Sequence, residues 1–196
     1  LVVGGGIAGM QAALDLADSG FKVYLLEISA GIGGLMAELD KTFPTNDCAM
    51  CTISPKLVDV GRHINVELLT DSQVLRVDGQ AGNFTATVRR KPRYIDVSKC
   101  TGCGDCAAVC PVILLDKFNE DLSPRRAAYK LYPQATPNAY AIEKKGIAPC
   151  RDACPTGQRA QGYIALIREG RYHDALRVIK EDNPFPGICG RICNHR

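Results

Sequence analysis

The sequence has no long apolar run, no signal peptide and no large excess of charge of either sign. No stretch approaches the roughly 20 consecutive apolar residues that a membrane-spanning helix needs, and no secretory leader pattern is visible. The 24 basic and 21 acidic residues leave a net charge of +3, too small to indicate nucleic-acid binding. We therefore expect a cytoplasmic protein that is not integral to a membrane and has no nucleic-acid partner.

Cysteine, by contrast, is abundant, with ten residues in a chain of 196. Without a secretory signal, this content indicates metal or redox ligands rather than a disulfide framework. One run has the spacing C-x2-C-x2-C-x3-C-P, by which a single loop places thiolates around a [4Fe–4S] cube. Zinc ribbons usually separate their cysteine pairs by ~15–20 residues, so the short interval disfavours zinc. The expected cube ligands are Cys100, Cys103, Cys106 and Cys110.

The residues between these cysteines fit a chain wrapped around a cube. Gly102 and Gly104 remove side chains near the inorganic sulfides, and Pro111 ends the wrap by fixing its own φ. In two-cluster ferredoxins the fourth cysteine of such a run ligates the other cube. No second complete run is present, so we expect Cys110 to close the same cube.

The N-terminal residues carry a dinucleotide-binding pattern. An apolar strand at residues 1–3 runs into a G-x-G-x-x-G motif, and a helix with an apolar stripe follows as far as Gly20. A second strand at 22–27 ends in an acidic residue, placed to accept hydrogen bonds from ribose hydroxyls. The glycines allow a tight turn, close approach of a pyrophosphate and close helix–strand packing. The expected residues are Gly4, Gly6, Gly9 and Glu27.

A second glycine pair, Gly33-Gly34, follows this acid. The combination resembles the extended fingerprint of the glutathione- and thioredoxin-reductase group of flavoproteins, so the resemblance favours FAD over NAD. Segments 65–70, 73–78 and 83–89 alternate as three short strands and predict a small β-meander. In that group such a meander interrupts the FAD-binding sheet before its last strand.

Cys48 and Cys51 lie between the glycine motifs and the expected meander. Ser54 is suited to cap a helix that begins at Pro55, which places the cysteine pair just before a helix N-terminus. This position lowers a thiol pKa and favours thiolate. Three interpretations remain open: ligands of a cluster near the flavin, which we favour, a redox dithiol, and inert cysteines.

The C-terminal third predicts a second iron–sulfur module. Residues 112–145 show little periodicity and suggest a linker, and helical patterns then cover 158–169 and 171–181. A C-x3-C pair stands on each side of this helical hairpin, and a proline follows the first pair. The expected ligands are Cys150, Cys154, Cys189 and Cys193.

One basic run, Arg89-Arg90-Lys91-Pro92-Arg93, stands out from an otherwise mixed charge pattern. We expect it to be a solvated strand end rather than a docking patch.

The order of these motifs resembles two known families. Residues 1–140 resemble the A subunit of the CoB–CoM heterodisulfide reductases, through GGGIAG, NDCAMCTISPKLVDVGRH, KPRYIDVSKCTGCGDCAAVCPV and PQATPN. Residues 146–196 resemble the iron–sulfur module of the glutamate synthase small subunit, through APCRDACP and NPFPGICGRIC. That module usually carries a further C-x-x-C upstream, and 141–149 contains no cysteine, which leaves its number of clusters open.

The resemblance implies an iron–sulfur flavoprotein oxidoreductase subunit that passes electrons between FAD and [4Fe–4S] clusters. The flavin would split or merge electron streams between partners of the reductase, hydrogenase or ferredoxin type. The alternatives are an NAD(P)H oxidoreductase like the glutamate synthase small subunit, and an electron-relay subunit without flavin turnover.

The expected fold class is α/β, with a Rossmann-like FAD-binding βαβ and a meander, a ferredoxin-like insert and a small all-α module. The expected segments are 1–93 for the FAD-binding part, 94–118 for the ferredoxin-like [4Fe–4S] segment, 119–145 for a linker and 146–196 for the helical iron–sulfur module. Leu1 begins directly on strand residues, and Arg196 follows closely on a cysteine motif. We therefore expect the chain to be a fragment of a longer protein.

Overall fold

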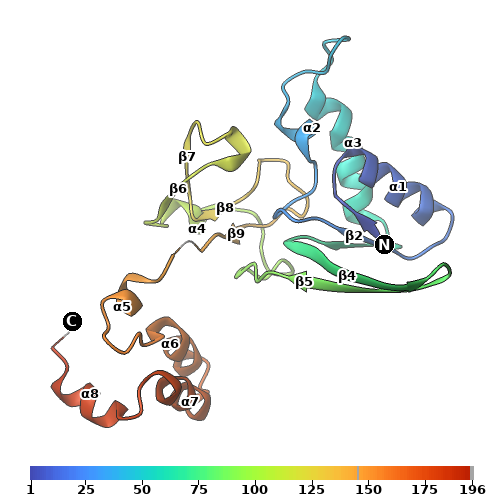
Figure 1. The fold of residues 1–196 in the computed structure, drawn as a ribbon. Helices are drawn as coiled ribbons and strands as arrows, with labels where there is room; N and C mark the ends of the chain where they lie inside the picture. Colours follow the sequence, from blue (N-terminus) through green and yellow to red (C-terminus); the bar gives the residue numbers. More distant parts are fainter. Residues whose placement is uncertain (145, 195–196) are drawn as a thin grey trace. The chain divides into compact units, whose positions relative to one another are not determined.

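A computed structural model describes residues 1–144 and 146–194 (Figure 1). The chain divides into two units, Leu1–Lys144 and Lys145–Arg196, which are considered separately below. No helix in the described ranges is long and apolar enough to cross a membrane.

A three-stranded parallel sheet forms the centre of the first unit. Its strands are β1 (Val2–Val3), β2 (Val23–Leu26) and β3 (Val66–Leu69), with β2 in the middle. Helix α1 (Ile7–Asp18) connects β1 to β2, and its predicted apolar stripe is buried in the core, which confirms the βαβ unit. The C-terminal end of α1 agrees with the prediction that the helix stops at Gly20, because the Gly20 N–H donates to Ala17 O.

Helix α3 (Ala49–Arg62) carries the chain back to the start of β3 and packs beside α1 (Figure 1). A short helix, α2 (Leu35–Glu38), precedes it. The sequence predicts that the β3 segment belongs to a three-stranded meander, and this is wrong. The helical crossover returns the chain parallel to β2, so the apolar side chains of β3 extend the central sheet instead.

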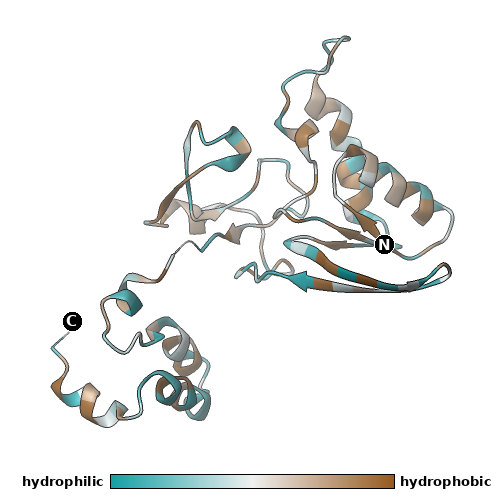
Figure 2. Ribbon diagram, in the orientation of Figure 1, coloured by the Kyte–Doolittle hydropathy of each residue, from teal (hydrophilic) through white to brown (hydrophobic). Residues whose placement is uncertain are grey.

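The remaining two strands of the expected meander pair as an isolated antiparallel hairpin. Strand β4 (Ser72–Gln80) pairs with β5 (Asn83–Arg90), with an irregularity in register between Val74 and Arg76. Figure 2 shows apolar and polar residues alternating along this hairpin, whereas β1 and β2 are almost uniformly apolar. This contrast is the one expected between a buried parallel sheet and a solvated hairpin.

The cysteine-rich segment follows the hairpin and is built from short elements. They are α4 (Asp105–Ala108), β6 (Ile113–Leu115), the 3-10 turn η1 (Lys117–Asn119) and β7 (Pro124–Arg126). Strands β6 and β7 form an antiparallel pair, and β8 (Ala128–Tyr129) pairs with β9 (Ala141–Ile142).

Most of the expected linker, residues 119–145, is part of the first unit. Tyr132 and Ala135 belong to the same buried cluster as the apolar stripe of α1. The Tyr132 ring stacks on Phe118 at 5.1 Å between centroids, and its hydroxyl donates to the Ile32 carbonyl. Burial, with a smaller contribution from the Glu27 charge, raises the pKa of Tyr132 to about 12, so the hydroxyl remains a donor at neutral pH. These contacts are long-range in sequence, so the lack of local periodicity did not reveal them.

The regular secondary structure of the second unit is all helical over its described residues. Its helices are α5 (Pro149–Asp152), α6 (Ala160–Arg168), α7 (Tyr172–Asp182) and α8 (Pro186–Ile192). The predicted hairpin of α6 and α7 is confirmed. It is closed by Arg159, whose Nε lies 2.8 Å from the Asp182 carboxylate. Residues 195 and 196 of the expected module lie outside the described ranges.

We expect Tyr132→Phe to lower the free energy of unfolding by about 1–3 kcal/mol, because it removes the hydroxyl that satisfies a buried carbonyl. Chemical denaturation of the purified protein measures this change. Tyr24→Phe is the matched control, since Tyr24 is largely exposed on β2. Equal midpoints for the two variants would contradict a structural role for the Tyr132 hydroxyl.

Candidate functional site

The first glycine motif forms a tight turn between β1 and α1. Gly4 has φ +101°, a conformation that favours glycine, and its N–H donates to Leu26 O at 2.8 Å. A Cβ at Gly9 would overlap the Gly4 carbonyl oxygen, so helix and turn approach too closely for any side chain there. Backbone conformation therefore favours glycine at Gly4, and backbone packing requires it at Gly9.

The second glycine pair lies directly against the first motif. The Gly33 N–H donates to Gly5 O at 2.8 Å, and a Cβ at Gly34 would lie 3.0 Å from the Gly6 Cα. A Cβ at Gly33 would stand 2.6 Å from the Tyr132 hydroxyl. The structure thus brings together two motifs that the sequence separates by more than 20 residues.

The Glu27 carboxylate stabilises the contact between the two glycine segments. Its Oε2 accepts from the Gly5 N–H at 2.7 Å, and its Oε1 accepts from both the N–H and the hydroxyl of Ser29 at 2.8 Å. Glu27 is almost completely buried. In the structure this carboxylate organises the two glycine segments, and its predicted contact with a ribose stays a prediction.

Gly5 is a member of this site that we did not single out from the sequence. A Cβ there would overlap the Ile32 side chain and approach the Glu27 carboxylate. The available signal was the run of three consecutive glycines, of which the G-x-G-x-x-G pattern uses only the outer two.

The glycine site fits a dinucleotide pyrophosphate. Gly6 is the N-cap of α1, and no side chain caps this helix. A Cβ at Gly6 would meet nothing within 4 Å, so open space lies beside the first N–H groups of the helix. Uncapped N–H groups and the positive end of the helix dipole favour a bound phosphate. The two adjoining glycine segments are therefore suited to a dinucleotide pyrophosphate, and binding of FAD by Gly4, Gly6, Gly9, Gly33 and Gly34 stays a prediction.

Three of the four cysteines in the first run, Cys100, Cys103 and Cys106, lie near one another. Burial raises the pKa of Cys106, and the neighbouring Cys100 and Cys103 add to this effect. The same three sulfurs act on the Tyr140 hydroxyl, whose pKa is raised chiefly by burial. The Tyr140 N–H donates to Cys100 Sγ at 3.4 Å. Mutual repulsion of thiolates is the charge pattern that iron binding would relieve.

Besides leaving room for inorganic sulfide, the glycines between the cysteines of the first run have a second role. Gly102 and Gly104 have φ of +75° and +92°. A Cβ at Gly102 would lie 2.7 Å from Asn138 Oδ1, and one at Gly104 would lie 2.9 Å from the Tyr140 hydroxyl. The segment before β9 therefore packs directly on the cysteine loop.

Cys110 lies in a different environment from the other three cysteines. Hydrogen bonds from the backbone at Ala128 and Val112 lower its pKa. Within the described residues, no group of three or more His, Cys, Asp or Glu side chains converges on one metal ion. A cube has four irons, and each thiolate binds a different one, so its ligands need not converge in that way. Closure of one cube by Cys110 stays a prediction.

The Cys48 and Cys51 pair begins helix α3. The sequence predicts a helix from Pro55 capped by Ser54, but α3 begins at Ala49 with Cys48 as its N-cap. The reason is local: Cys48 Sγ accepts from the Cys51 N–H at 3.1 Å, and the Ser54 hydroxyl donates back to Met50 O instead of capping. The pair therefore lies within the first turn of the helix.

Cys48 and Cys51 are joined in a disulfide, with their Cα atoms 5.2 Å apart. Among the three interpretations, this arrangement matches a redox pair, and oxidised sulfurs present no thiolate to iron. The preference for cluster ligation is not confirmed by the structure and stays a prediction for the reduced protein.

The four cysteines of the second unit lie on short helices. Cys150 lies within α5 and Cys154 follows it. Cys189 lies within α8 and Cys193 follows it. Each pair therefore has one cysteine within a short helix and one just after the end of that helix. A hydrogen bond with the Thr156 hydroxyl lowers the pKa of Cys154 and favours its thiolate.

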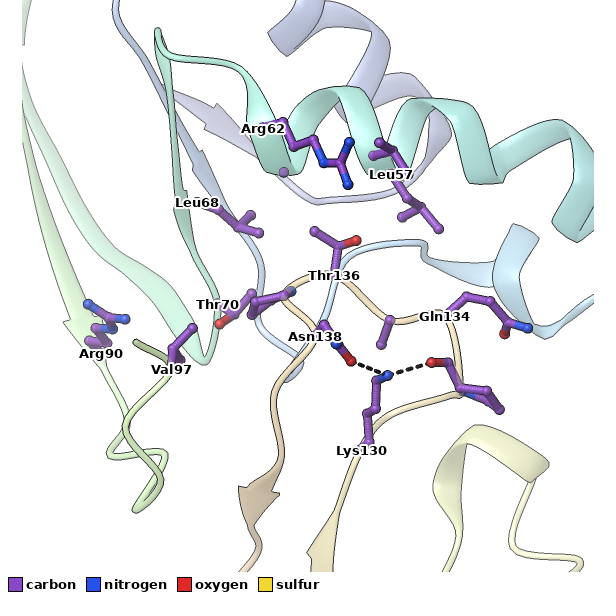
Figure 3. Close-up of a pocket in the computed structure, with 15 residues that line it drawn as sticks. Leu57, Arg62, Leu68, Thr70, Arg90, Val97, Lys130, Gln134, Thr136 and Asn138 are labelled. Carbon is purple, nitrogen blue, oxygen red and sulfur yellow. Dashed lines mark hydrogen bonds between the residues drawn. The ribbon is translucent and has the colours of Figure 1, made fainter. Parts of the chain in front are cut away.

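One pocket of the first unit is separate from both sites (Figure 3). Its volume is about 620 Å³, and it lies between the end of α3, strand β3 and residues 130–138. Arg62, Arg90 and Lys130 line it, and Lys130 Nζ donates to Asn138 Oδ1 and to the Pro133 carbonyl. No cysteine and none of the predicted flavin-binding glycines contributes to this lining.

Three protein-family models match the chain. An NAD(P)-binding Rossmann-like domain matches residues 2–64, and a 4Fe-4S binding domain matches 94–115. The model described as dihydropyrimidine dehydrogenase domain II, 4Fe-4S cluster, matches 126–196. The α/β fold class with ferredoxin-like and helical iron–sulfur parts is thereby confirmed. The chain thus combines a Rossmann-like nucleotide-binding domain with two parts that match [4Fe–4S] domains.

Its curated relatives are more specific. The chain is 55% identical over 142 residues to the second iron–sulfur A subunit of CoB–CoM heterodisulfide reductase from Methanopyrus kandleri, covering 72% of this chain and 22% of that protein. It is 52% identical over 150 residues to the A subunit of H2:CoB–CoM heterodisulfide, ferredoxin reductase from Methanothermobacter marburgensis, covering 76% and 23%. The chain belongs to the family of the heterodisulfide reductase A subunits and spans about a quarter of the length of these relatives.

Among solved structures, the crystal structure of L-proline dehydrogenase from P. horikoshii is 28% identical, with a TM-score of 0.39. The match covers 45% of this chain and 18% of that one. This likeness is too slight to support an argument.

We expect Gly6→Val, in the full-length protein, to abolish flavin binding without unfolding the first unit. The open space beside Gly6 accommodates the side chain, which then fills the phosphate position. Absorbance of bound flavin and the unfolding midpoint measure the two effects. Gly9→Ala is the contrast, because its Cβ would collide with Gly4 and lower stability as well. A Gly6→Val protein with full flavin content would show that the site is misassigned.

Replacing Cys48 and Cys51 together with serine distinguishes their two active roles. As cluster ligands, their loss lowers the iron content and removes an EPR signal while FAD remains bound. As a dithiol, their loss leaves iron unchanged and removes the thiolate-to-flavin charge-transfer band of the two-electron reduced protein. We expect the iron content to fall; constant iron and an unchanged EPR spectrum would contradict this.

Proposed function

We propose that the protein to which this chain belongs is an FAD- and iron–sulfur-dependent oxidoreductase subunit. It passes electrons between FAD and [4Fe–4S] clusters within a complex like heterodisulfide reductase, in a form of flavin-based electron bifurcation. The family models for Rossmann and [4Fe–4S] domains support the two cofactor types, and the names of the relatives support the kind of complex.

The observation that carries this proposal is the segment between Tyr132 and Tyr140, which touches both sites. At one end Tyr132 donates to the Ile32 carbonyl, and the Ile32 N–H donates to Thr136 O at 2.9 Å. At the other end the Tyr140 N–H donates to Cys100 Sγ. A flavin at the glycines and a cube at the cysteines would thus share one rigid connection, as direct electron exchange requires.

The roles of the residues follow from this arrangement. A bound flavin supplies two-electron chemistry, and iron–sulfur clusters supply one-electron steps. The glycine segments and Glu27 bind and orient the dinucleotide, and the thiolates hold the clusters. We assign Cys100, Cys103, Cys106 and Cys110 to one cube and Cys150, Cys154, Cys189 and Cys193 to the helical module.

The partners we propose are other electron-transfer subunits of the same complex, of the reductase, hydrogenase or ferredoxin type. The relatives are named as subunits, one of them of a reductase whose name includes hydrogen, a heterodisulfide and ferredoxin. We place the protein in the cytoplasm, where the cysteines of the two runs stay reduced.

A second candidate is an NAD(P)H oxidoreductase related to the glutamate synthase small subunit. It is favoured by the match of residues 126–196 to an iron–sulfur model described for a different dehydrogenase, together with the NAD(P)-binding Rossmann model. A partner protein that performs glutamine chemistry, and glutamate formation in the reconstituted complex, would decide for this alternative.

We expect anaerobically purified full-length protein to contain FAD, iron and acid-labile sulfide, and Cys103→Ser to remove one cube's worth of iron and sulfide. A hydroxyl does not replace the charge and softness of a thiolate. Iron and sulfide assays measure the loss. Thr101→Ser, a change at an exposed neighbour in the same loop, is the control. Zinc at this site in place of iron, with no sulfide, would refute the proposal.

A further inference from the structure

Arg93 does not behave like the rest of the basic run in which it stands. Arg89, Arg90 and Lys91 are exposed, as expected of a solvated strand end. The Arg93 side chain is only 9% exposed. A buried guanidinium is costly unless its donors are paired, so its partners indicate what it holds.

Every contact of the Arg93 guanidinium crosses between segments far apart in the sequence. Its Nη1 donates to Ala30 O at 2.7 Å and to Thr70 Oγ1 at 3.0 Å, at the ends of β2 and β3. Its Nε donates to Tyr140 O at 2.9 Å, and its Nη2 donates to Ala139 O at 2.7 Å. One side chain therefore joins the sheet ends beside the glycine site to the segment that packs on the cysteine loop.

The connection reaches a predicted cluster ligand through one residue. Tyr140 accepts from Arg93 with its carbonyl and donates with its own N–H to Cys100 Sγ at 3.4 Å. On the other side, Ala30 stands three residues before Gly33. Arg93 is thus the side chain that spans the interval between the predicted flavin and cluster sites.

The charge of Arg93 is balanced by one carboxylate at a longer distance. Asp71 Oδ2 lies 3.3 Å from Nη1, and its side chain is 18% exposed. Burial lowers the pKa of Arg93, whereas Asp71, Tyr129 and Cys100 raise it. Burial also raises the pKa of Asp71, against the attraction of Arg93. Arg93, which bonds to the Tyr140 carbonyl, therefore places a buried positive charge close to the cysteine loop. Asp71 places a negative charge beside Arg93.

We propose that Arg93 is a positioning residue that fixes the cysteine loop against the flavin-binding segment and raises the reduction potential of the cluster held there. The inference rests on the proposed function. Reduction adds negative charge to a cluster, so a nearby buried cation stabilises the reduced form, and hydrogen bonds to ligand sulfurs act in the same direction. Asp71 opposes this effect, so the two residues set the potential with opposite signs.

The test is an EPR-monitored redox titration of the anaerobic full-length protein. We expect Arg93→Gln to lower the ratio of reduced to oxidised cluster at fixed potential by about tenfold, the order of effect of one charge in a partly desolvated site. For a one-electron couple this is a shift of about 59 mV to more negative potential. Asp71→Asn, which keeps the side-chain shape, should shift the potential the other way.

Two further variants separate charge from packing. Arg93→Lys keeps the charge but loses the fork that contacts Ala30, Ala139 and Tyr140 together, so the potential should change less than in Arg93→Gln while the unfolding midpoint falls. Arg90→Gln removes the same charge from an exposed member of the run, where water screens it, and should leave the potential unchanged.

If Arg93 and Asp71 had a purely structural role, Arg93→Gln and Asp71→Asn would both loosen the cysteine loop. The two reduction potentials would then shift in the same direction or not at all. Either result overturns the inference. If Arg93→Gln does not fold, Asp71→Asn and Arg93→Lys decide, and an unshifted Asp71→Asn overturns it. A wild-type protein without iron, sulfide or an EPR signal refutes the proposed function itself. The two failures are therefore distinguishable.

Discussion

The backbone contact between Ile32 and Thr136, closed by the Tyr132 hydroxyl, is the constraint on which the rest of the first unit depends. It fastens the chain after the cysteine loop to the segment between the two glycine motifs. It places Tyr132 and Ala135 in the buried core. Because both glycine motifs pack against each other through Gly5 and Gly33, this attachment and the hydrogen bonds of Arg93 to Ala139 and Tyr140 together fix the cysteine loop relative to the dinucleotide site.

Two buried charged groups near this attachment, Glu27 and Arg93, are hydrogen-bonded to segments far along the chain. Glu27 is bonded to the backbone at Gly5 and Ser29, and Arg93 is bonded to carbonyls at Ala30, Ala139 and Tyr140. Within the described residues, no buried side-chain nitrogen or oxygen is left without a hydrogen-bond partner. Such fully satisfied polar networks specify one arrangement of a small core, because any other arrangement would leave a charge buried alone. The electron-transfer role that we propose requires the same fixed arrangement.

The second unit is organised differently. Its helical hairpin is fastened by Arg159, Glu181 and Asp182, whereas its cysteines lie on the short helices outside the hairpin. Most of its large apolar side chains are at least partly exposed. A module of about 50 residues has little core of its own, and a bound metal cluster is one common way for such a module to gain stability. Cluster binding and folding are therefore expected to be coupled here.

The sequence by itself determined the features that depend on neighbouring residues. Glycine spacing, cysteine spacing and the apolar stripes of α1 and of the α6–α7 hairpin are local, and they identified the Rossmann unit, the iron–sulfur motifs and the family. Only the tertiary structure decided that residues 66–69 extend the parallel sheet, that α3 begins at the cysteine pair, and that most of the expected linker belongs to the first unit. It also decided that Arg93 is buried while Arg90 is exposed. These outcomes depend on which distant segment supplies a strand-pairing partner or a hydrogen-bond acceptor. The local sequence of a segment does not identify that partner.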